Sequence, residues 1–285
     1  MVRKSSSYVT TLLLAPMAMW MVVFLILPVL VVLVYSFGEL AEMGGYRPAF
    51  TFAQYANLPA RWTAFKNTLV LAPVGTLAAL LIAYPLAYYL ARKVRASRRL
   101  ILLTLVIVPF WTSFLIRTYA WMFILGRRGI PTILEYFGIE GVRLINTPTA
   151  VLIGIVYGYL PLMVFPIFVS LEKLDESLLE ASNDLGASPI RTFLQVTLPL
   201  SLPGVATACM IVFIWLMGEF LIPALLGGGK VFFIGNALVD LFLQSRNWPF
   251  GSAVAITLVV IMLVTVTLYM RLIFRPEKTR EVSMI

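Results

Sequence analysis

The chain has 285 residues, of which 61% are hydrophobic and only 12% are charged, and its formal net charge is +9. A soluble globular domain carries about 25% charged residues, so this composition excludes one and indicates an integral membrane protein. The sequence has no histidine and a single cysteine, Cys209, which leaves no basis for a His-based catalytic triad, a His/Cys zinc site or a disulfide framework.

Apolar runs long enough to span a bilayer, which requires about 20 residues, recur along the whole chain. The sequence therefore predicts an all-α fold, a polytopic membrane protein whose residues 1–285 form one membrane domain with six transmembrane helices. The first apolar run is about twice as long as that of a signal peptide, so we interpret it as a retained helix. The predicted helices cover residues 12–37, 66–91, 100–124, 148–171, 202–226 and 252–274.

Lysine and arginine are distributed unevenly between alternate loops, and the segment RKVRASRR at residues 92–99 holds five of them. Because cytoplasmic loops are enriched in these residues, we predict that this segment and both termini lie in the cytoplasm. The net positive charge then suits contact with anionic membrane lipid. We expect no nucleic acid partner, since no basic run is interleaved with stacking aromatic residues. The same side also holds Arg3, Lys4, Arg271, Arg275, Lys278 and Arg280.

The longest polar stretch inside the chain, EASNDLGASPIRTFLQVTLP, lies between the fourth and fifth predicted helices at residues 180–199. Gly186 suits the left-handed residue that follows a helix, and Ser188 before Pro189 is typical of a helix start. We predict two short helices around a tight bend, the second ending where Pro199 turns the chain back into the membrane. The apolar positions of the first helix have the spacing of one helix face and are Leu174, Leu178, Ala181 and Leu185.

The whole loop, residues 172–201, is longer than a connection between two membrane helices requires. On the predicted orientation it lies in the cytoplasm. A folded polar hairpin in that place indicates a docking surface for another protein, with a plain linker as the less favoured alternative.

The spacing of this stretch resembles the EAA loop of ABC-importer permeases, written as EAA, three residues, G, nine residues, I, one residue and LP. Ser182 and Val196 replace the alanine and the isoleucine of that pattern. The resemblance implies a type I ABC-importer permease, a multi-pass protein of the bacterial inner membrane, in which the loop forms a coupling helix seated on a separate ATPase subunit. The matching positions are Glu180, Ala181, Ser182, Gly186, Val196, Leu198 and Pro199.

The sequence has no phosphate-binding Walker A loop of its own. The nearest candidate, ALLGGGKV, has Ala224 in place of the first glycine and Val231 in place of the required hydroxyl residue. We therefore expect a non-catalytic subunit that binds no cofactor, with ATP and Mg²⁺ held by the partner ATPase. The resemblance further implies an ATPase dimer, a homologous second permease and a soluble periplasmic or extracellular binding protein as partners.

Three other segments resemble the first permease subunit of bacterial spermidine/putrescine importers, and they are PFWTSFLIRTYAW at 109–121, GEFLIPALLGGG at 218–229 and NWPFGSA at 247–253. This resemblance implies polyamine import, with an opine or another amino-acid-like cation as the alternative cargo. An ion-coupled secondary transporter is a weaker alternative, because Glu219 is the one clearly intramembrane carboxylate. A membrane-embedded enzyme is not supported, since no catalytic cluster is visible.

Charged and aromatic residues within the third and fifth predicted helices are the candidates for a substrate path. If each span is one continuous helix, then Phe110, Phe114, Arg117 and Trp121 share a face of the third, and Trp215 and Glu219 share a face of the fifth. Arg117 and Glu219 each lie 17 residues from the inner end, and hence at similar depth. The full candidate set is Phe110, Trp111, Phe114, Arg117, Trp121, Trp215 and Glu219.

Two interpretations of these residues stay open at this point. In the first, Arg117 and Glu219 form a buried ion pair that fixes the packing of two helices, and Trp121 belongs to the outer aromatic belt. In the second, Glu219 and the rings line a path for a flexible polycation, the carboxylate meeting an ammonium group and the rings attracting its neighbours by cation–π interaction.

Overall fold

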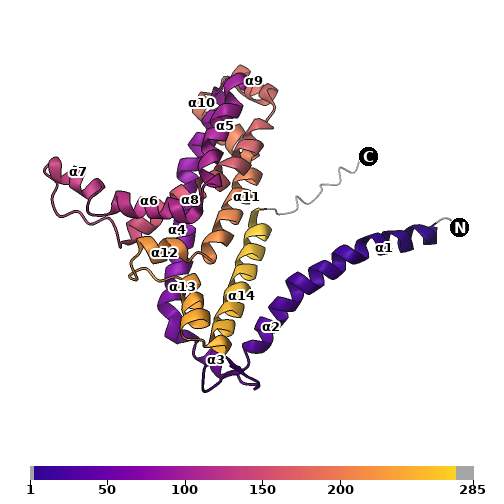
Figure 1. The fold of residues 1–285 in the computed structure, drawn as a ribbon. Helices are drawn as coiled ribbons and strands as arrows, with labels where there is room; N and C mark the ends of the chain where they lie inside the picture. Colours follow the sequence, from indigo (N-terminus) through magenta and orange to yellow (C-terminus); the bar gives the residue numbers. More distant parts are fainter. Residues whose placement is uncertain (1–2, 274–285) are drawn as a thin grey trace. The chain divides into compact units, whose positions relative to one another are not determined.

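The computed structural model describes residues 3–273, and their side chains from residue 10 onward. Of the residues on which the predicted orientation depends, the side chains of Arg3 and Lys4 and all of Arg275, Lys278 and Arg280 lie outside the described part, as does residue 274 of the sixth predicted span. Apart from one pair of two-residue strands, the described elements are all helical. Their order along the chain can be followed in Figure 1.

Five helices are long and apolar enough to cross a membrane, and a sixth span is present if one sharply bent helix pair is counted as a single span. This confirms the prediction of an all-α polytopic membrane protein. The five cover Thr10–Tyr35, Leu58–Lys93, Pro148–Glu172, Pro189–Met217 and Trp248–Ile273, and the bent pair covers Ala96–Trp111 and Phe114–Tyr136.

The described residues form two compact units, and the first combines residues 3–62 with 237–261. The guanidinium of Arg61 donates to the carboxylate of Asp240 at 2.7 Å, and the ring of Tyr35 lies parallel to that of Trp248 at 6.4 Å. These contacts tie the two chain segments of the unit together. Its elements are α1 (Arg3–Met21), η1 (Val22–Ile26), α2 (Leu27–Tyr35), β1 (Glu39–Leu40), β2 (Tyr46–Arg47), α3 (Ala53–Ala56), η2 (Leu58–Arg61), η5 (Asp240–Gln244) and the first part of α14 (Trp248–Ile273).

The second unit comprises residues 63–236 and 262–273 of the described chain. It contains the cavity and the cytoplasmic loop discussed below. Its elements are α4 (Trp62–Tyr88), η3 (Tyr89–Lys93), α5 (Ala96–Trp111), α6 (Phe114–Leu125), α7 (Ile130–Tyr136), α8 (Pro148–Glu172), α9 (Glu176–Asp184), α10 (Pro189–Thr192), η4 (Phe193–Thr197), α11 (Leu198–Met217), α12 (Leu221–Leu226), the first half of α13 (Ile234–Val239), whose second half belongs to the first unit, and the end of α14.

Small residues set the helix packing of the second unit. A Cβ atom on Gly154 of α8 would lie 2.5 Å from the side chain of Leu226, and one on Gly158 would lie 3.1 Å from the ring of Phe114. Helices α6 and α12 therefore approach α8 where it lacks side chains, as small residues allow inside a membrane. Helix α4 has a column of fully buried alanines, Ala72, Ala79, Ala83 and Ala87.

The third predicted span is not one straight helix. Helix α5 ends at Trp111, Thr112 is extended, and the chain resumes as α6 in a direction that differs by 90°. Both the N–H and the hydroxyl of Thr112 bond to the Pro109 carbonyl, which satisfies a carbonyl that the break sets free. The prediction that Phe110 shares a continuous helix face with Phe114 is therefore wrong, and so is the depth argument that assumed a straight helix.

The fifth predicted span breaks as well. Helix α11 ends at Met217, Gly218 and Glu219 lie outside any helix, and the short α12 begins at Leu221. The prediction of one helix over 202–226, with Trp215 and Glu219 on a common face, is wrong. The helix breaks here because the side chain of Glu219 accepts hydrogen bonds from backbone N–H groups that follow it in the chain, in place of a turn of helix, as described next.

Candidate functional site

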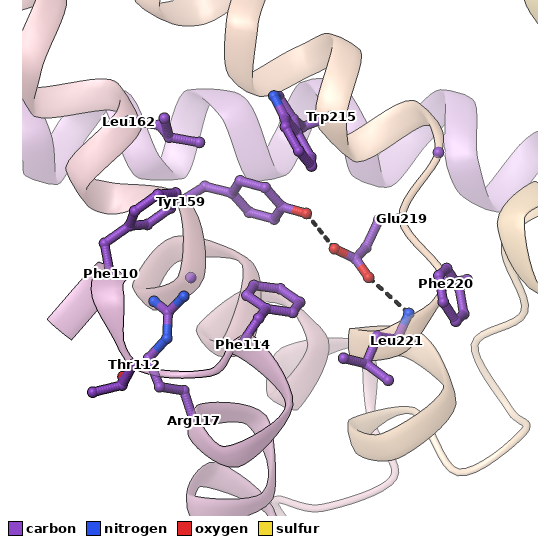
Figure 2. A pocket seen from close by; sticks show the side chains of 12 residues that line it. Phe110, Thr112, Phe114, Arg117, Tyr159, Leu162, Trp215, Glu219, Phe220 and Leu221 are labelled. Atoms are coloured by element: carbon purple, nitrogen blue, oxygen red, sulfur yellow. Dashed lines mark hydrogen bonds between the residues drawn. The ribbon is translucent and has the colours of Figure 1, made fainter.

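A cavity of about 460 Å³ lies within the second unit, next to both helix breaks. Figure 2 shows Arg117 on one side of it and Glu219 on the other, with aromatic rings between and around them. Four of its lining residues, Gly158 and the polar Arg117, Tyr159 and Glu219, are buried. The cavity is lined by Phe110, Thr112, Phe114, Arg117, Gly158, Tyr159, Leu162, Trp215, Gly218, Glu219, Phe220 and Leu221.

Glu219 is 6% exposed, and both of its carboxylate oxygens accept hydrogen bonds. Oε1 accepts from the backbone N–H groups of Leu221 at 2.7 Å and Ile222 at 3.1 Å, which caps the N-terminus of α12. Oε2 accepts from the hydroxyl of Tyr159 on α8 (Figure 2). Both oxygens of Glu219 therefore have partners at the start of α12 and on α8, and none of these partners is a cationic side chain.

Arg117 is also buried, with 8% of its surface exposed, yet no carboxylate lies within ion-pair distance of it in the described part of the chain. Its guanidinium carbon instead lies over the rings of Phe110 and Phe114, 5.5 and 5.4 Å from their centres. Its Nε has no hydrogen-bond partner among the described atoms. The predicted Arg117–Glu219 ion pair is therefore wrong as an explanation of the packing here.

The structure brings together five of the seven residues proposed for a substrate path. Phe110, Phe114, Arg117, Trp215 and Glu219 line the cavity. Two do not. Trp111 is 79% exposed, and Trp121 packs edge-on against Tyr157 with ring centres 5.4 Å apart.

Tyr159 is the main functional candidate that the sequence did not single out. It lies on α8, a helix with no charged residue before Glu172, and it is 4% exposed. A buried tyrosine in a membrane helix needs a partner for its hydroxyl, and this signal could have directed attention to it. Its pairing with Glu219 could not be seen, since 60 residues separate them.

Chemically, the cavity suits a cation. It offers one carboxylate and several aromatic faces in a mostly apolar lining, and a cation gains about 0.5–2 kcal/mol from such a face depending on how far it is desolvated. It has no group of three or more metal-binding side chains within the described residues.

The predicted conformation of the hairpin is confirmed in its first half. Asp175 caps α9 by accepting from the N–H of Ser177 at 3.0 Å, and this bond holds the pKa of Asp175 below its ordinary value. Gly186 has φ +76°, the left-handed conformation expected after a helix. Ser188 accepts from the N–H of Arg191 and Pro189 opens α10. The base of the loop is held by Arg99, which donates to Glu172 at 3.1 Å.

The second half of the hairpin differs from the prediction. Pro199 does not turn the chain, because α10, the π-helical turn η4 and α11 run on as one helical segment from Pro189 to Met217. Proline is tolerated at the first positions of α11 because they follow the π-helical turn η4, where the regular hydrogen-bond ladder is already interrupted. The two helical arms are joined by a bond between the hydroxyls of Ser182 and Thr192, 2.9 Å apart.

Apolar side chains of the hairpin are exposed to an unusual degree. Leu185, beside Gly186 at the tip, is 88% exposed, and Ile190 is 73% exposed. We call these two together with Leu178 and Leu194 the hairpin surface; all four are exposed. Of the motif residues, Glu180 and Ala181 are exposed at the same end, whereas Val196 and Leu198 are half-buried along the second arm.

The comparisons with known proteins agree with this geometry. Residues 75–280 match the family model described as binding-protein-dependent transport system inner membrane component. The chain is 42% identical over 257 residues to the spermidine/putrescine transport system permease protein PotB of Haemophilus influenzae, covering 88% of this chain and 90% of that protein. With PotB of Escherichia coli strain K12 the identity is 40% over 257 residues, covering 88% and 93%.

Among solved structures, the fold matches a chain from the crystal structure of a bacterial ABC transporter involved in the import of the acidic polysaccharide alginate. The TM-score is 0.78 over 96% of this chain and 98% of that one. The sequence identity is 19%, so this likeness concerns the fold alone.

Proposed function

We propose, from the premise that the chain belongs to the family of binding-protein-dependent transport system inner membrane components, that it carries polyamines across the inner membrane. The chain is a multi-pass, non-catalytic permease subunit of an ABC importer. It acts in a complex with an ATPase and a periplasmic binding protein. The substrate, the site residues and the further subunits are our proposals.

The observation that carries the substrate proposal is the cavity: the carboxyl group of buried Glu219 and several aromatic rings line it, together with Arg117. Spermidine and putrescine are flexible chains of methylene groups with ammonium groups at intervals. An ammonium group would meet Glu219, while the methylene groups and a second ammonium group would lie against Phe114, Trp215 and Phe110. The likeness to the PotB permeases of two bacteria supports the same cargo.

The hairpin surface supports the proposed place of the ATPase. Exposed leucine and isoleucine side chains on a polar hairpin form an apolar patch that is favourable to cover. One hairpin occurs in this chain, and ABC motors act as dimers, so we propose two permease chains per transporter. The second is a homologue, and each hairpin docks on one ATPase subunit, where ATP and Mg²⁺ bind. Lipid surrounds the remaining helix faces.

The substrate proposal is tested by Glu219→Gln, which removes the charge and keeps an acceptor oxygen for the start of α12. Loss of a charge-assisted contact of about 1.5–3 kcal/mol should lower labelled spermidine uptake at least tenfold, since about 1.4 kcal/mol is a factor of ten. Uptake is measured in cells that lack other polyamine importers and is normalised to the amount of subunit in the membrane.

Tyr159→Phe is the matched control, because it removes the other partner of the same hydrogen bond while the carboxylate keeps its charge. If Glu219 serves only to hold α12, both variants should lower thermal stability alike and leave uptake per folded subunit unchanged. That result would refute the substrate path. The double variant Glu219→Gln with Arg117→Gln should not restore uptake, because no ion pair joins the two residues.

A second cargo is favoured by one observation. Arg117 is buried without an anionic partner among the described residues, and a substrate carboxylate would supply one. An amino-acid-like cation or an opine carries both an ammonium and a carboxylate group. Uptake of such a compound with no uptake of spermidine would favour this alternative.

A further inference from the structure

We propose that Arg117 is a built-in cation that occupies the aromatic part of the cavity and competes there with the ammonium group of the cargo. This inference rests on the proposed polyamine transport. In this role Arg117 lowers the affinity of the permease for its cargo. The role differs from that of a residue in a packing ion pair and from that of a residue that binds the substrate.

The first argument is the position of the guanidinium group. It lies over two rings at once, with centre distances of 5.5 Å to Phe110 and 5.4 Å to Phe114. Both fall inside the range of about 6 Å over which a ring face attracts a cation. A substrate ammonium group would use the same faces, so the two cations exclude each other from this place.

The second argument is that the other attractive group of the cavity is also occupied by the protein itself. Glu219 accepts from Tyr159 and from two backbone N–H groups of the α12 start. A polyamine that enters must therefore exchange with the Tyr159 hydroxyl at Glu219 and with the Arg117 guanidinium at the rings (Figure 2). Binding by exchange is weaker than binding to vacant groups, because existing contacts are lost as new ones form.

The third argument is electrostatic. A buried arginine keeps its charge, and here no carboxylate neutralises it within ion-pair distance among the described residues. Two like charges in an apolar cavity repel each other strongly, since the local dielectric constant is well below that of water. Arg117 therefore lowers the affinity of the cavity for a cation, and it returns to the rings as the cation leaves.

Such a device suits a permease whose cargo is captured elsewhere. The periplasmic binding protein supplies the high affinity, whereas a permease that held a polycation tightly between a carboxylate and aromatic rings would release it slowly. Arg117 would then promote release by refilling the ring faces.

The test uses the assembled transporter in lipid nanodiscs without the binding protein, with radiolabelled spermidine as the probe. Arg117→Met removes the charge and keeps an unbranched side chain of moderate length. We expect spermidine to bind this variant at least tenfold more tightly than the wild type, while import driven by ATP and the binding protein becomes slower. Arg117→Lys, which keeps a cation near the rings, should stay close to wild type in both measurements.

If Arg117→Met does not assemble, as judged by recovery of all subunits and by thermal stability, Arg117→Gln serves in its place with the same expectation. Unchanged or weaker spermidine binding in the neutral variants would overturn the inference, because it would make Arg117 a packing residue or a partner for a substrate carboxylate.

Failure of the proposed polyamine transport itself would be seen in a separate measurement, the uptake of labelled spermidine by cells. Cells with the wild-type transporter would then take up no labelled spermidine, and the Glu219→Gln variant would behave as wild type. Tighter binding to the neutral Arg117 variants in cells that do import spermidine supports both proposals together.

Discussion

The cavity and the hairpin belong to the same structural unit but differ in which side chains they bury: the cavity buries charged and polar side chains, and the hairpin exposes apolar ones. In the cavity, Glu219 and Arg117 are buried: Glu219 accepts from a hydroxyl and two N–H groups of the same chain, and Arg117 lies over two rings. In the hairpin, the polar caps are satisfied locally, while Leu185 and Ile190 are 88% and 73% exposed. The carboxyl group of Glu219 is satisfied within one chain, whereas the hairpin surface is where we propose that another protein docks.

This difference teaches where each part of the function can be perturbed. Changes to the hairpin surface should alter assembly with the ATPase and leave the subunit itself folded. Changes to the cavity should alter transport with the complex intact. Four variants test this division, from the largest expected effect to the smallest.

The largest effect is expected for Gly186→Pro. Gly186 has φ +76° and its N–H bonds to the Asn183 carbonyl at 2.8 Å, so proline would lose that bond and could not adopt the angle. We expect the bend to open, the ATPase to dissociate on detergent extraction and uptake to be lost, with membrane insertion unchanged. Co-purification of the ATPase with the tagged permease measures the outcome.

Gly138→Pro is the matched control for this change. Gly138 has φ +81°, and its N–H bonds to the Glu135 carbonyl at 3.0 Å, so the local geometry is nearly the same. It follows α7, away from the hairpin. We expect the ATPase to stay bound. Release of the ATPase by both variants would show general misfolding and would refute the assignment of Gly186 to coupling.

The second variant is Leu185→Asp, which places a charge on the hairpin surface. Because Leu185 is 88% exposed, the change should cost the isolated permease little stability. Burying that charge against an ATPase groove should weaken docking at least tenfold, or about 1.4 kcal/mol. Leu243→Asp, at a leucine 73% exposed in the first unit, is the control and should retain the ATPase. Equal retention in the two variants would contradict the docking role.

The third variant disturbs the cavity through its scaffold. A Cβ on Gly154 would lie 2.5 Å from Leu226 and 2.9 Å from Ile222, both on the helix that Glu219 caps. Gly154→Ala should therefore displace α12, with an overpacking cost of about 1–3 kcal/mol, and should cut uptake about threefold with the ATPase still bound. Gly218→Ala has no neighbour closer than 4.0 Å and should have a smaller effect. Loss of the ATPase from the Gly154→Ala variant would contradict the expectation that changes to the cavity leave the complex intact.

The hairpin was largely predictable from the sequence because its signals are local. A serine before proline and a glycine after a helix determine the conformation of their own residues, and the structure has Ser188 and Gly186 in those roles. The error concerned Pro199, since a proline that follows a π-helical turn inside a continuous helical segment and a proline at a turn look alike in a sequence.

The cavity was less predictable because its geometry comes from distant residues. Apolar runs through Thr112 and Gly218 read as continuous helices, and membrane helices often tolerate such residues without breaking. The breaks follow from contacts across the fold, such as the bond from Tyr159 to Glu219. Five of seven candidates reached the cavity, since charge and aromatic character were correct signals even where the assumed helix face was not.

The smallest effect is expected for the cap of the hairpin's first helix. Asp175 accepts from the N–H of Ser177, and this bond lowers the pKa of its carboxyl. A lowered pKa in the folded state means that the cap contributes fully above the unfolded value of about 3.9 and is lost only as the pH falls through the lower folded value. Asp175→Ala should therefore reduce uptake by less than about twofold, because the capping group is fully exposed and only one bond is lost. The ratio of variant to wild-type uptake should stay constant between about pH 6 and about pH 8, where the carboxyl is ionised throughout. Asp175→Asn, which also caps helices well, should match wild type. A ratio that changes across this range would mean that Asp175 contacts a titrating group of the docked ATPase, and the hairpin would then depend on its partner for its polar groups as well as its apolar ones.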